Sequence, residues 1–281
     1  MNPLSPDQVR ELVETARTLA QEAGELVREG RRRHVGVAAT KSSAQDVVTA
    51  MDLASEALLR RRLAELRPDD AILGEEEAFR PGTSGITWVV DPIDGTVNYL
   101  YGISAYAVSV AAVVGPDPTS APDPATWTAV AGCVFAPEDG RTFTAGLGLG
   151  ASLDGVRLHA NEPRPLIDSL VGTGFGYVAT RRRVQGRIVA ELLPRVRDIR
   201  RVGSAALDLC AVAAGTLDLY YERGLQPWDL AAGALIAQEA GAQVTGLRGG
   251  PAQESMTVAG PAGRIEELRS LLESLDADSD G

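Results

Sequence analysis

The chain has few of the features that mark secreted or membrane-spanning proteins. It contains only two cysteines among 281 residues. Cys133 and Cys210 both lie within apolar runs, as small buried residues of a reducing compartment do. The sequence shows no run of 18 apolar residues and no N-terminal signal peptide. These absences argue against a disulfide-stabilised or membrane protein, and they predict a cytoplasmic protein with no membrane partner.

Positive charge and histidine are also scarce. The 27 lysines and arginines are outnumbered by 38 aspartates and glutamates, so the net charge is −11 and nucleic acid is not an expected partner. Three short arginine runs, 31–33, 60–62 and 181–183, are expected to lie on solvated helix faces. Neither His34 nor His159 belongs to a plausible triad, so we expect both at the surface and no covalent nucleophile.

What is present is the composition of a globular protein with a sizeable core. Apolar residues make up 44% of the chain and charged residues 23%, and the length suits one large domain or two joined ones. A cap at Ser5 and apolar residues at helical spacing from Val9 to Val27 predict a long first helix. Thr49 begins a second helix. The apolar stripe expected on that helix includes Ala54, Leu58, Leu63 and Leu66.

The pattern of apolar runs changes along the chain. Strands and hairpins follow one another in the first half, whereas strands and helices alternate in the second. We therefore predict an α+β half over 5–145, an α/β half over 146–275 and a frayed acidic tail over 276–281. The glycine-rich run 146–150 lacks the spacing of a dinucleotide-binding loop and is assigned to a hairpin.

The stretch 88–99 carries the clearest sign of chemistry. Three apolar residues end at Asp91, a proline follows, and Asp94 comes three residues after the first aspartate. Gly95 and Thr96 then offer bare backbone and a hydroxyl group. An ordinary Asp-Gly turn is the alternative interpretation. Because close carboxylates repel each other unless a cation or proton lies between them, the spacing favours a metal- and phosphate-binding turn at the end of a buried strand.

Further carboxylates stand at comparable points of the chain. Glu75 follows a short apolar run and would point to the same place as Asp91 if the two strands are neighbours. Hard oxygen ligands of this kind suit Mg²⁺. Asp52 lies three residues after Thr49, a spacing that equally suits a helix cap. Asp229 opens a helix, where the helix dipole alone would favour a carboxylate.

Four short motifs occur in a fixed order. Residues 88–99 read W-x-x-D-P-I-D-G-T-x-N-Y, and residues 228–233 with 239–242 read W-D-L-A-A-G and E-A-G-A. The segments 49–52 and 74–76 precede them with T-x-x-D and G-E-E. With these motifs the chain resembles the inositol monophosphatase family of magnesium-dependent sugar phosphatases over nearly its whole length, although the family has a glycine where the second motif ends in alanine. The resemblance implies a layered αβαβα sandwich of the inositol monophosphatase and fructose-1,6-bisphosphatase type.

The resemblance also implies a centre of two Mg²⁺ ions, bridged by Asp91, with a weaker third ion near Glu75. The implied metal ligands are Glu75, Asp91, the backbone carbonyl of Ile93, Asp94 and Asp229. Asp52, Thr96 and Glu75 would orient the attacking water, and Lys41 would lie on a mobile loop over the site. The residues implied to meet the substrate are Asp94, Gly95, Thr96, Gly203, Ser204, Ala205 and Glu222.

We therefore expect an Mg²⁺-dependent phosphomonoesterase that hydrolyses inositol monophosphate, or a related small polyol phosphate, by attack of metal-activated water. The segment 220–224 resembles the inositol-specific subgroup. Alternatives with the same fold are phosphatases of histidinol phosphate, fructose 1,6-bisphosphate or adenosine 3′,5′-bisphosphate. An alternative of another class is a regulatory binding protein that retains the fold and contacts polymerase or ribosome factors. The family further implies lithium inhibition and a possible homodimer, with the phosphate monoester as the small-molecule partner.

Overall fold

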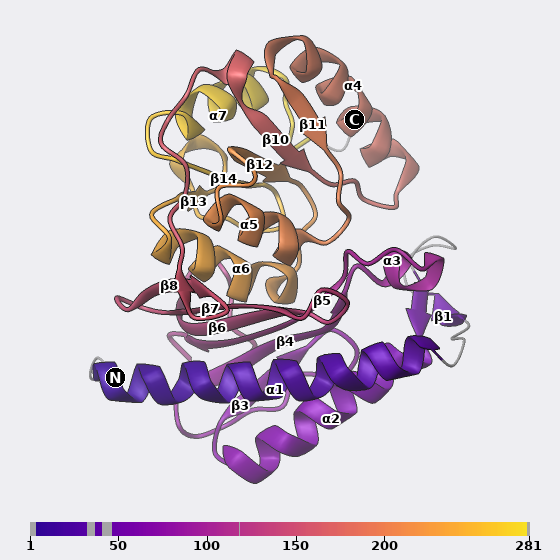
Figure 1. Ribbon diagram of the computed structural model, residues 1–281, viewed down its shortest axis with the longest axis vertical. Helices are drawn as coiled ribbons and strands as arrows, with labels where there is room; N and C mark the ends of the chain where they lie inside the picture. Colours follow the sequence, from indigo (N-terminus) through magenta and orange to yellow (C-terminus); the bar gives the residue numbers. More distant parts are fainter. Residues whose placement is uncertain (1–3, 33–36, 41–46, 118, 280–281) are drawn as a thin grey trace.

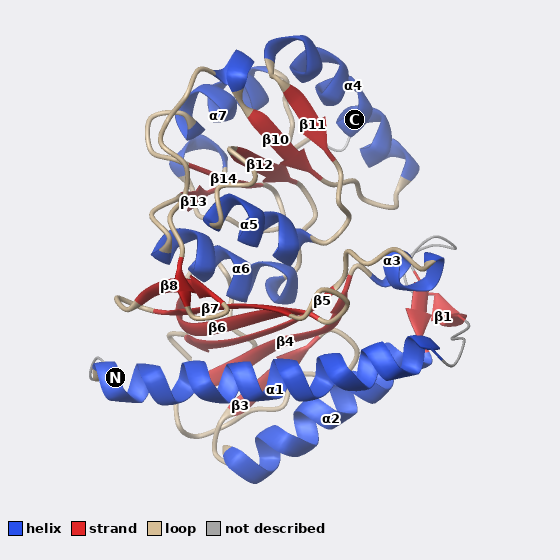
Figure 2. Cartoon of the chain, in the orientation of Figure 1, coloured by secondary structure: helices blue, strands red, loops and turns tan. Residues whose placement is uncertain are grey.

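The computed structural model describes residues 4–32, 37–40, 47–117 and 119–279. These residues build five layers, in the order helices, sheet, helices, sheet, helices (Figure 1). Figure 2 shows the two sheets separated by a middle layer of helices and covered by helices on their outer faces. The predicted αβαβα sandwich is therefore confirmed.

The first layer consists of α1 (Pro6–Arg32) and α2 (Ala50–Leu66), which pack on the outer face of the larger sheet. Helix α1 buries the apolar stripe that was predicted for it. For α2 the predicted stripe is wrong in part, because Ala54 and Leu66 are exposed. The buried residues of α2 are Asp52, Ser55, Glu56, Leu59 and Leu63. The buried face of α2 thus begins with polar residues and is apolar only from Leu59 onward. A prediction based on apolar residues alone therefore assigns the wrong face of the helix to the core.

The larger sheet has the strand order β3-β4-β5-β6-β7-β8-β9. Its strands are β3 (Ala71–Gly74), β4 (Ile86–Asp94), β5 (Ala107–Val114), β6 (Thr128–Ala136), β7 (Arg141–Gly146), β8 (Gly150–Leu153) and β9 (Val156–Arg157). Strands β3 and β4 are parallel neighbours, so the residues that follow them meet at one edge. Strand β4 continues past Asp91 to Asp94 with a shift in its register against β5. The turn predicted at Asp91 is therefore a bulge within the strand.

The boundary predicted at residues 145/146 falls inside β7, and β8 and β9 continue the same sheet. A boundary drawn between the two sheets would lie after Arg157, and the division into two halves stays a prediction. Residues 146–150 join β7 to β8 in a hairpin, as predicted for this glycine-rich run.

The second sheet has the strand order β11-β10-β12-β14-β13. Its strands are β10 (Leu170–Thr173), β11 (Asp198–Arg200), β12 (Leu219–Glu222), β13 (Gln243–Thr245) and β14 (Thr257–Gly260). Helices α5 (Ala205–Ala213) and α6 (Pro227–Glu239) lie between the sheets, while α4 (Ala179–Leu192) and α7 (Ile265–Ser274) cover the outer face. The shorter elements are β1 (Val37–Thr40), β2 (Val47–Thr49), α3 (Thr96–Tyr101), η1 (Leu166–Asp168), η2 (Leu193–Arg195) and η3 (Leu247–Gly249).

Gly132 allows the middle layer to approach the larger sheet closely. A Cβ atom on Gly132 of β6 would lie 3.1 Å from the Cα atom of Ala232 in α6. We expect Gly132→Val to lower the free energy of unfolding by about 2–3 kcal/mol, because the added methyl groups overpack this contact. Denaturant unfolding measures the change. Gly186→Ala is the control: an added Cβ there, in α4, has no neighbour within 4 Å and should stabilise by roughly 0.5–1 kcal/mol. An unchanged midpoint for Gly132→Val would contradict the close approach.

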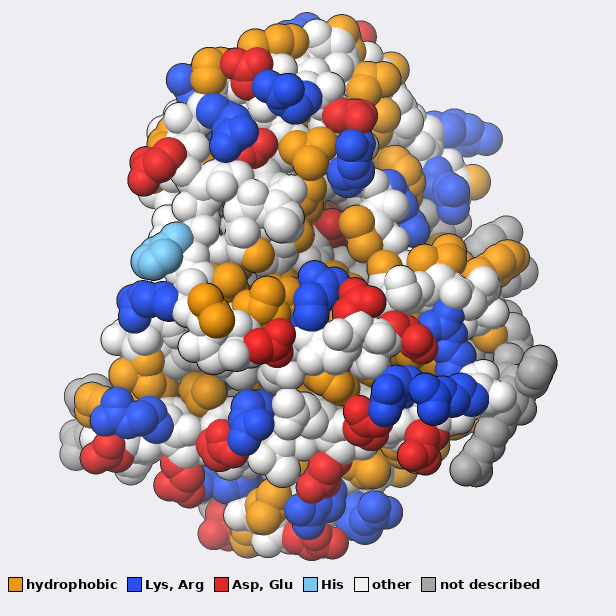
Figure 3. Space-filling model, viewed as in Figure 1, with side chains coloured by type: hydrophobic (Ala, Val, Ile, Leu, Met, Phe, Trp, Pro, Cys, Tyr) orange, Lys and Arg blue, Asp and Glu red, His pale blue; other side chains and the backbone are white. Residues whose placement is uncertain are grey.

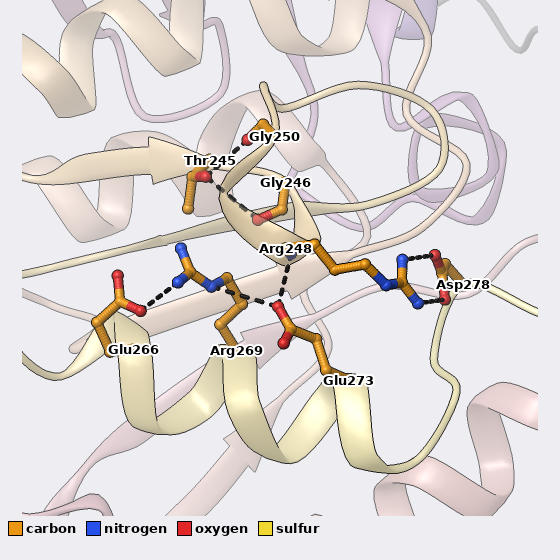
Figure 4. Close-up of polar contacts among 8 residues, drawn as sticks. All are labelled: Thr245, Gly246, Arg248, Gly250, Glu266, Arg269, Glu273 and Asp278. Atoms are coloured by element: carbon orange, nitrogen blue, oxygen red, sulfur yellow. Dashed lines mark hydrogen bonds and ion pairs between the residues drawn. The ribbon is translucent and has the colours of Figure 1, made fainter.

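The C-terminal segment 276–279 is docked, so the predicted fraying is wrong for these residues. Ala277 is 1% exposed and packs with α7 and the second sheet. Asp278 forms an ion pair with Arg248, in which Nη1 lies 2.6 Å from Oδ2 (Figure 4). The carbonyl of Ser279 accepts a hydrogen bond from Arg223. The partners of this acidic segment come from other elements, which a local pattern cannot reveal.

The arginine runs are less solvated than expected. Figure 3 shows acidic and basic side chains interspersed over the outer helices, but Arg31 pairs with Glu138 at 2.8 Å and its guanidinium lies 5.2 Å from the ring centre of Tyr106. Arg60 pairs with the fully buried Glu56 of the same helix and donates to the carbonyl oxygen of Glu77, beyond β3, at 2.8 Å. These arginines therefore hold elements together as well as solvating the surface.

The two cysteines and one of the two histidines lie where the sequence predicts them. Cys133 and Cys210 are both free and buried, as predicted. His159 is exposed, as predicted, whereas His34 and Lys41 lie outside the described residues. Among the helices of the described chain, none combines the length and the apolar character needed to cross a membrane.

Candidate metal centre

Three carboxylates from distant parts of the chain converge at one point. Asp91 and Asp94 belong to the end of β4, and Asp229 belongs to the first turn of α6. One carboxylate oxygen from each residue lies within 4.8 Å of those from the other two. The fold thus brings together three of the residues that the sequence motifs predict as metal ligands.

The backbone holds two of these carboxylates in place. Asp91 Oδ1 accepts a hydrogen bond from the N–H of Ile93 at 2.9 Å, within the bulge of β4. Asp229 Oδ2 accepts from the N–H of Gln226 at 2.7 Å, as part of the capping box that begins α6. The helix-cap interpretation of Asp229 is therefore correct, and the same side chain also faces the cluster.

Asp94 is held by the start of α5. Its Oδ2 accepts hydrogen bonds from the Ser204 hydroxyl at 2.6 Å and from the Ala206 N–H at 2.7 Å. Gly95, directly after it, has φ +98°, and a Cβ atom there would lie 3.0 Å from the Ala105 carbonyl oxygen. The chain can therefore turn from β4 into α3 at this point only with glycine.

Glu75 reaches the same site from the end of β3. It lines the same cavity, and after burial its charge is the next largest cause of the raised pKa of Asp91. The loop that carries Glu75 is held by Glu56 of α2, which accepts from the N–H of Glu76 at 2.8 Å and of Glu77 at 3.0 Å. Sequence reasoning missed Glu56. The sequence does hold one indication that Glu56 is buried: it lies on the same face of the helix as Leu59.

Burial, and after it the repulsion between carboxylates, raises the pKa values of the aspartates in this cluster. Burial, followed by the charges of Glu75, Asp94 and Asp229, raises the pKa of Asp91 well above its usual range. Burial, followed by the charges of Asp94 and Glu75, also raises the pKa of Asp229. Burial raises the pKa of Asp94 too, although the hydrogen bonds from Ser204 and from α5 oppose the shift. Buried carboxylate oxygens that repel one another in this way fit a hard divalent cation, which would relieve the repulsion.

Asp52 combines the two interpretations weighed from the sequence. Its Oδ2 accepts from the N–H of Thr49 at 2.8 Å in the capping box of α2. Its Oδ1 lies 3.0 Å from the hydroxyl of Thr96, which is also 3.1 Å from the carbonyl oxygen of Ile93. Burial raises the pKa of Asp52. One buried carboxylate thus links a helix cap to the rim of the cluster.

A cavity of about 430 Å³ opens in front of these groups. The predicted site residues that line it are Glu75, Asp91, Ile93, Asp94, Gly95, Thr96, Gly203, Ala205, Glu222 and Asp229. Ser204 is 1% exposed and its hydroxyl is bound to Asp94. The predicted contact of Ser204 with substrate stays a prediction, as does the mobile-loop role of Lys41.

Comparison with known proteins agrees with this geometry. The family model described as "Inositol monophosphatase family" matches residues 8–276. The chain belongs to the inositol monophosphatase family. This membership supports a phosphatase, a hydrolase of phosphate esters, in a family whose members depend on metal ions.

Relatives of this inositol monophosphatase family member carry two kinds of name. "Inositol-1-monophosphatase SuhB" of Mycobacterium tuberculosis is 46% identical over 279 residues, with 92% of each chain covered. "Nus factor SuhB" of Escherichia coli is 37% identical over 233 residues, covering 82% of this chain and 83% of that one. The solved structure of Mycobacterium tuberculosis SuhB superposes with a TM-score of 0.78 at 43% identity, covering 96% of this chain and 98% of that one.

Three arginines of this family member also line the cavity, and sequence reasoning did not place them there. They are Arg181, which was expected to be solvated, Arg201 and Arg223. The charge of Arg201 opposes the upward pKa shifts of Asp94 and Glu222. Two of these arginines could have been found by their closeness in the sequence to predicted site residues. Arg201 comes two residues before Gly203, and Arg223 directly follows Glu222.

Proposed function

We propose that this chain is an Mg²⁺-dependent phosphomonoesterase that hydrolyses inositol monophosphate or a related small polyol phosphate. The observation that carries the proposal is the convergence of Asp91, Asp94 and Asp229 on one cavity. Relatives that are 46% identical over 92% of the chain are named inositol-1-monophosphatases, which supports the choice of substrate.

Two groups of ligands would hold the ions. Glu75, Asp91 and the carbonyl of Ile93 would form one group, and Asp91, Asp94 and Asp229 the other. When bound, paired divalent ions neutralise the phosphate, lower the pKa of water and stabilise the leaving alkoxide. Because Asp91 belongs to both groups, it is the ligand on which both ions would depend.

The chain's own groups would position the water and the phosphate. With its proton donated to Asp52, the Thr96 hydroxyl presents a lone pair that can accept a hydrogen bond from a water molecule in the cavity. The N–H groups of Gly95 and Thr96, at the start of α3, would receive phosphate oxygens. The water and the phosphate would thereby be held next to each other before reaction.

The other wall of the cavity would bind the alcohol part of the substrate. Glu222 lines the cavity, and its Oε2 accepts from the Tyr220 hydroxyl at 2.7 Å, which leaves acceptor capacity for a sugar hydroxyl. Gly203 and Ala205 line the same wall. Arg181, on this cavity as well, offers a charge that a second anionic group could use. Fructose 1,6-bisphosphate and adenosine 3′,5′-bisphosphate carry such a second group, whereas histidinol phosphate does not; all three are the rival substrates to compare.

A panel of phosphate esters with a magnesium titration tests the proposal. We expect phosphate release from inositol monophosphate with a kcat/KM at least about tenfold above that for each rival ester, which is a difference of about 1.4 kcal/mol in transition-state binding. Chelation should abolish release, magnesium should restore it, and lithium should inhibit it. Release that persists unchanged in the presence of a chelator would contradict the proposal.

A regulatory role is the second candidate, because relatives that are 37% identical are named Nus factor SuhB. A pull-down with the catalytically inactive Asp91→Asn variant separates this role from turnover, since a binding role would survive the substitution.

The homodimer, the cytoplasmic location and the absence of a nucleic-acid partner also stay predictions. Size-exclusion chromatography tests the homodimer.

A further inference from the structure

We propose that the C-terminal segment 276–279 is a positioning element for the substrate-binding end of the cavity, and that it acts through Arg223. The inference rests on the proposed function, because Arg223 directly follows Glu222, the predicted sugar ligand. The contact between Arg223 and Ser279 joins the last described residue of the chain to the wall of the candidate active site.

The wall segment 222–226 is a turn between β12 and α6 that is held from two sides. The N–H of Gly224, which has φ +103°, donates to the carbonyl oxygen of Glu254 at 2.8 Å. The guanidinium of Arg223 donates through Nη1 to the Ser279 carbonyl, and Arg223 is only 9% exposed. The C-terminal segment therefore supplies one of the described supports of this turn, and it does so to a largely buried charge.

The C-terminal segment is itself fixed, so it can serve as a support. Ala277 is 1% exposed, and its N–H donates to the Leu272 carbonyl at 3.1 Å. Asp278 binds both terminal nitrogens of Arg248, at 2.6 and 3.2 Å, and the N–H of Arg248 donates to Glu273 of α7 at 2.6 Å (Figure 4). An apolar anchor and an ion pair thus hold the segment in place independently of Arg223.

Most of the metal end of the cavity depends on other contacts; the exception is Asp229, which accepts from the N–H of Gln226 at the end of the wall segment. Asp91 is oriented by the bulge of β4, and Asp94 by the Ser204 hydroxyl and the start of α5. Loss of the C-terminal segment would remove one acceptor of a largely buried guanidinium, which is costly, so the wall turn should shift. The binding of the alcohol part of the substrate should then weaken. Metal binding should change little, because the buried side chain of Leu225 anchors the chain between Arg223 and Gln226.

Two variants remove the support in different ways. One is truncated after Leu275, and the other is the full chain with Ala277→Asp, which undocks the segment because its anchor cannot bury a charge. For both we expect KM for inositol monophosphate to rise about tenfold, as for the loss of one charge-assisted hydrogen bond. The kcat and the magnesium concentration at half-maximal activity should stay within about twofold. Ala121→Asp adds the same charge to the exposed loop between β5 and β6 and should change neither constant.

A double-mutant cycle tests the route through Arg223. Arg223→Met in the full chain should raise KM, and adding the truncation to it should raise KM less than twofold further, because coupled residues are not additive. Independent effects that multiply would overturn the route. An unchanged KM in both the truncated and the Ala277→Asp chains would overturn the proposal, and so would a joint change of kcat and the magnesium midpoint.

Amide hydrogen exchange gives a readout that does not need turnover. In Ala277→Asp, amides 222–224 should exchange faster than in the wild type, while those of β4 and of Gln226 should keep their rates. Equal rates at 222–224 would overturn the proposal even if wild-type protein releases phosphate. If wild-type protein releases no phosphate from any ester, the proposed function fails, and the exchange rates still decide whether the C-terminal segment supports the wall. If the truncated chain does not fold, the full-length variant decides alone.

Discussion

Replacing Asp91 by asparagine is expected to lower magnesium-dependent phosphate release by about a thousandfold or more. Asp91 would belong to both groups of metal ligands, and its carboxylate lies within 4.8 Å of those of Asp94 and Asp229. Asparagine can keep the hydrogen bond from the Ile93 N–H, so the local fold should survive. The substitution removes the negative charge, and with it the affinity for the divalent ions. The measurement is phosphate release from inositol monophosphate across a magnesium titration.

Unfolding in the absence of metal supplies the complementary readout. Burial and neighbouring carboxylates raise the pKa of Asp91, which shows that its charged form is unfavourable without a cation. Asp91→Asn should therefore unfold at a higher denaturant midpoint than the wild type in a chelating buffer. Asp168→Asn, which makes the same chemical change at an exposed site, should leave turnover and midpoint near the wild-type values. Near-wild-type turnover of Asp91→Asn would refute the ligand assignment.

Asp208→Asn is expected to stabilise the protein at neutral and alkaline pH. Asp208 of α5 is 1% exposed, and neither carboxylate oxygen has a hydrogen-bond partner among the described residues. Burial, together with the charges of Glu222 and Asp94, raises the pKa of Asp208 to about 8. Between roughly pH 4 and 8 the folded state therefore binds more protons than the unfolded state, so the contribution of Asp208 to stability falls as the pH rises through this window.

Asparagine removes this titration. The gain in the free energy of unfolding should be close to zero at pH 4 and at least about 2 kcal/mol at pH 8, as measured by denaturant unfolding at both pH values. Asp218→Asn is the matched control, because Asp218 is also buried but accepts hydrogen bonds from Asn161 and from the Leu170 N–H. The same substitution there should destabilise. A gain for Asp208→Asn that does not depend on pH would show that its carboxyl is not the titrating group.

The carboxylates that converge at the candidate centre could be predicted from the sequence because they lie at places where an apolar run stops or a helix begins. Asp91 directly follows the apolar run Trp88–Val90, Asp94 ends the same strand, and the Trp-Asp motif distinguishes Asp229 from an ordinary helix cap. Their convergence depends on two features that patterns also supply: neighbouring parallel strands and a helix that begins at the sheet edge. The metal end of the site is therefore encoded locally.

The rest depends on partners that are distant in the sequence. Glu56 accepts hydrogen bonds from the N–H groups of residues 76 and 77 in its buried position. No pattern in the sequence around position 56 predicts these two partners. Arg181 sits in a basic run that is typical of a solvated helix, yet α4 places it on the cavity. The acidic ending has the composition of a frayed tail, and only the positions of Arg223 and Arg248 in the fold give it a docking site.

Asp94 and Asp229 belong to different layers, since one ends a strand of the larger sheet and the other begins a helix of the middle layer. The second group of ligands, Asp91, Asp94 and Asp229, draws on both layers, so the affinity for the ion it would hold would report whether the layers have assembled. A cation that binds only the assembled chain stabilises it. At a free concentration a hundred times its dissociation constant, the cation would add about 2.7 kcal/mol to the free energy of unfolding. Magnesium supply would then set how long the protein survives heat or proteolysis, apart from any part it has in turnover.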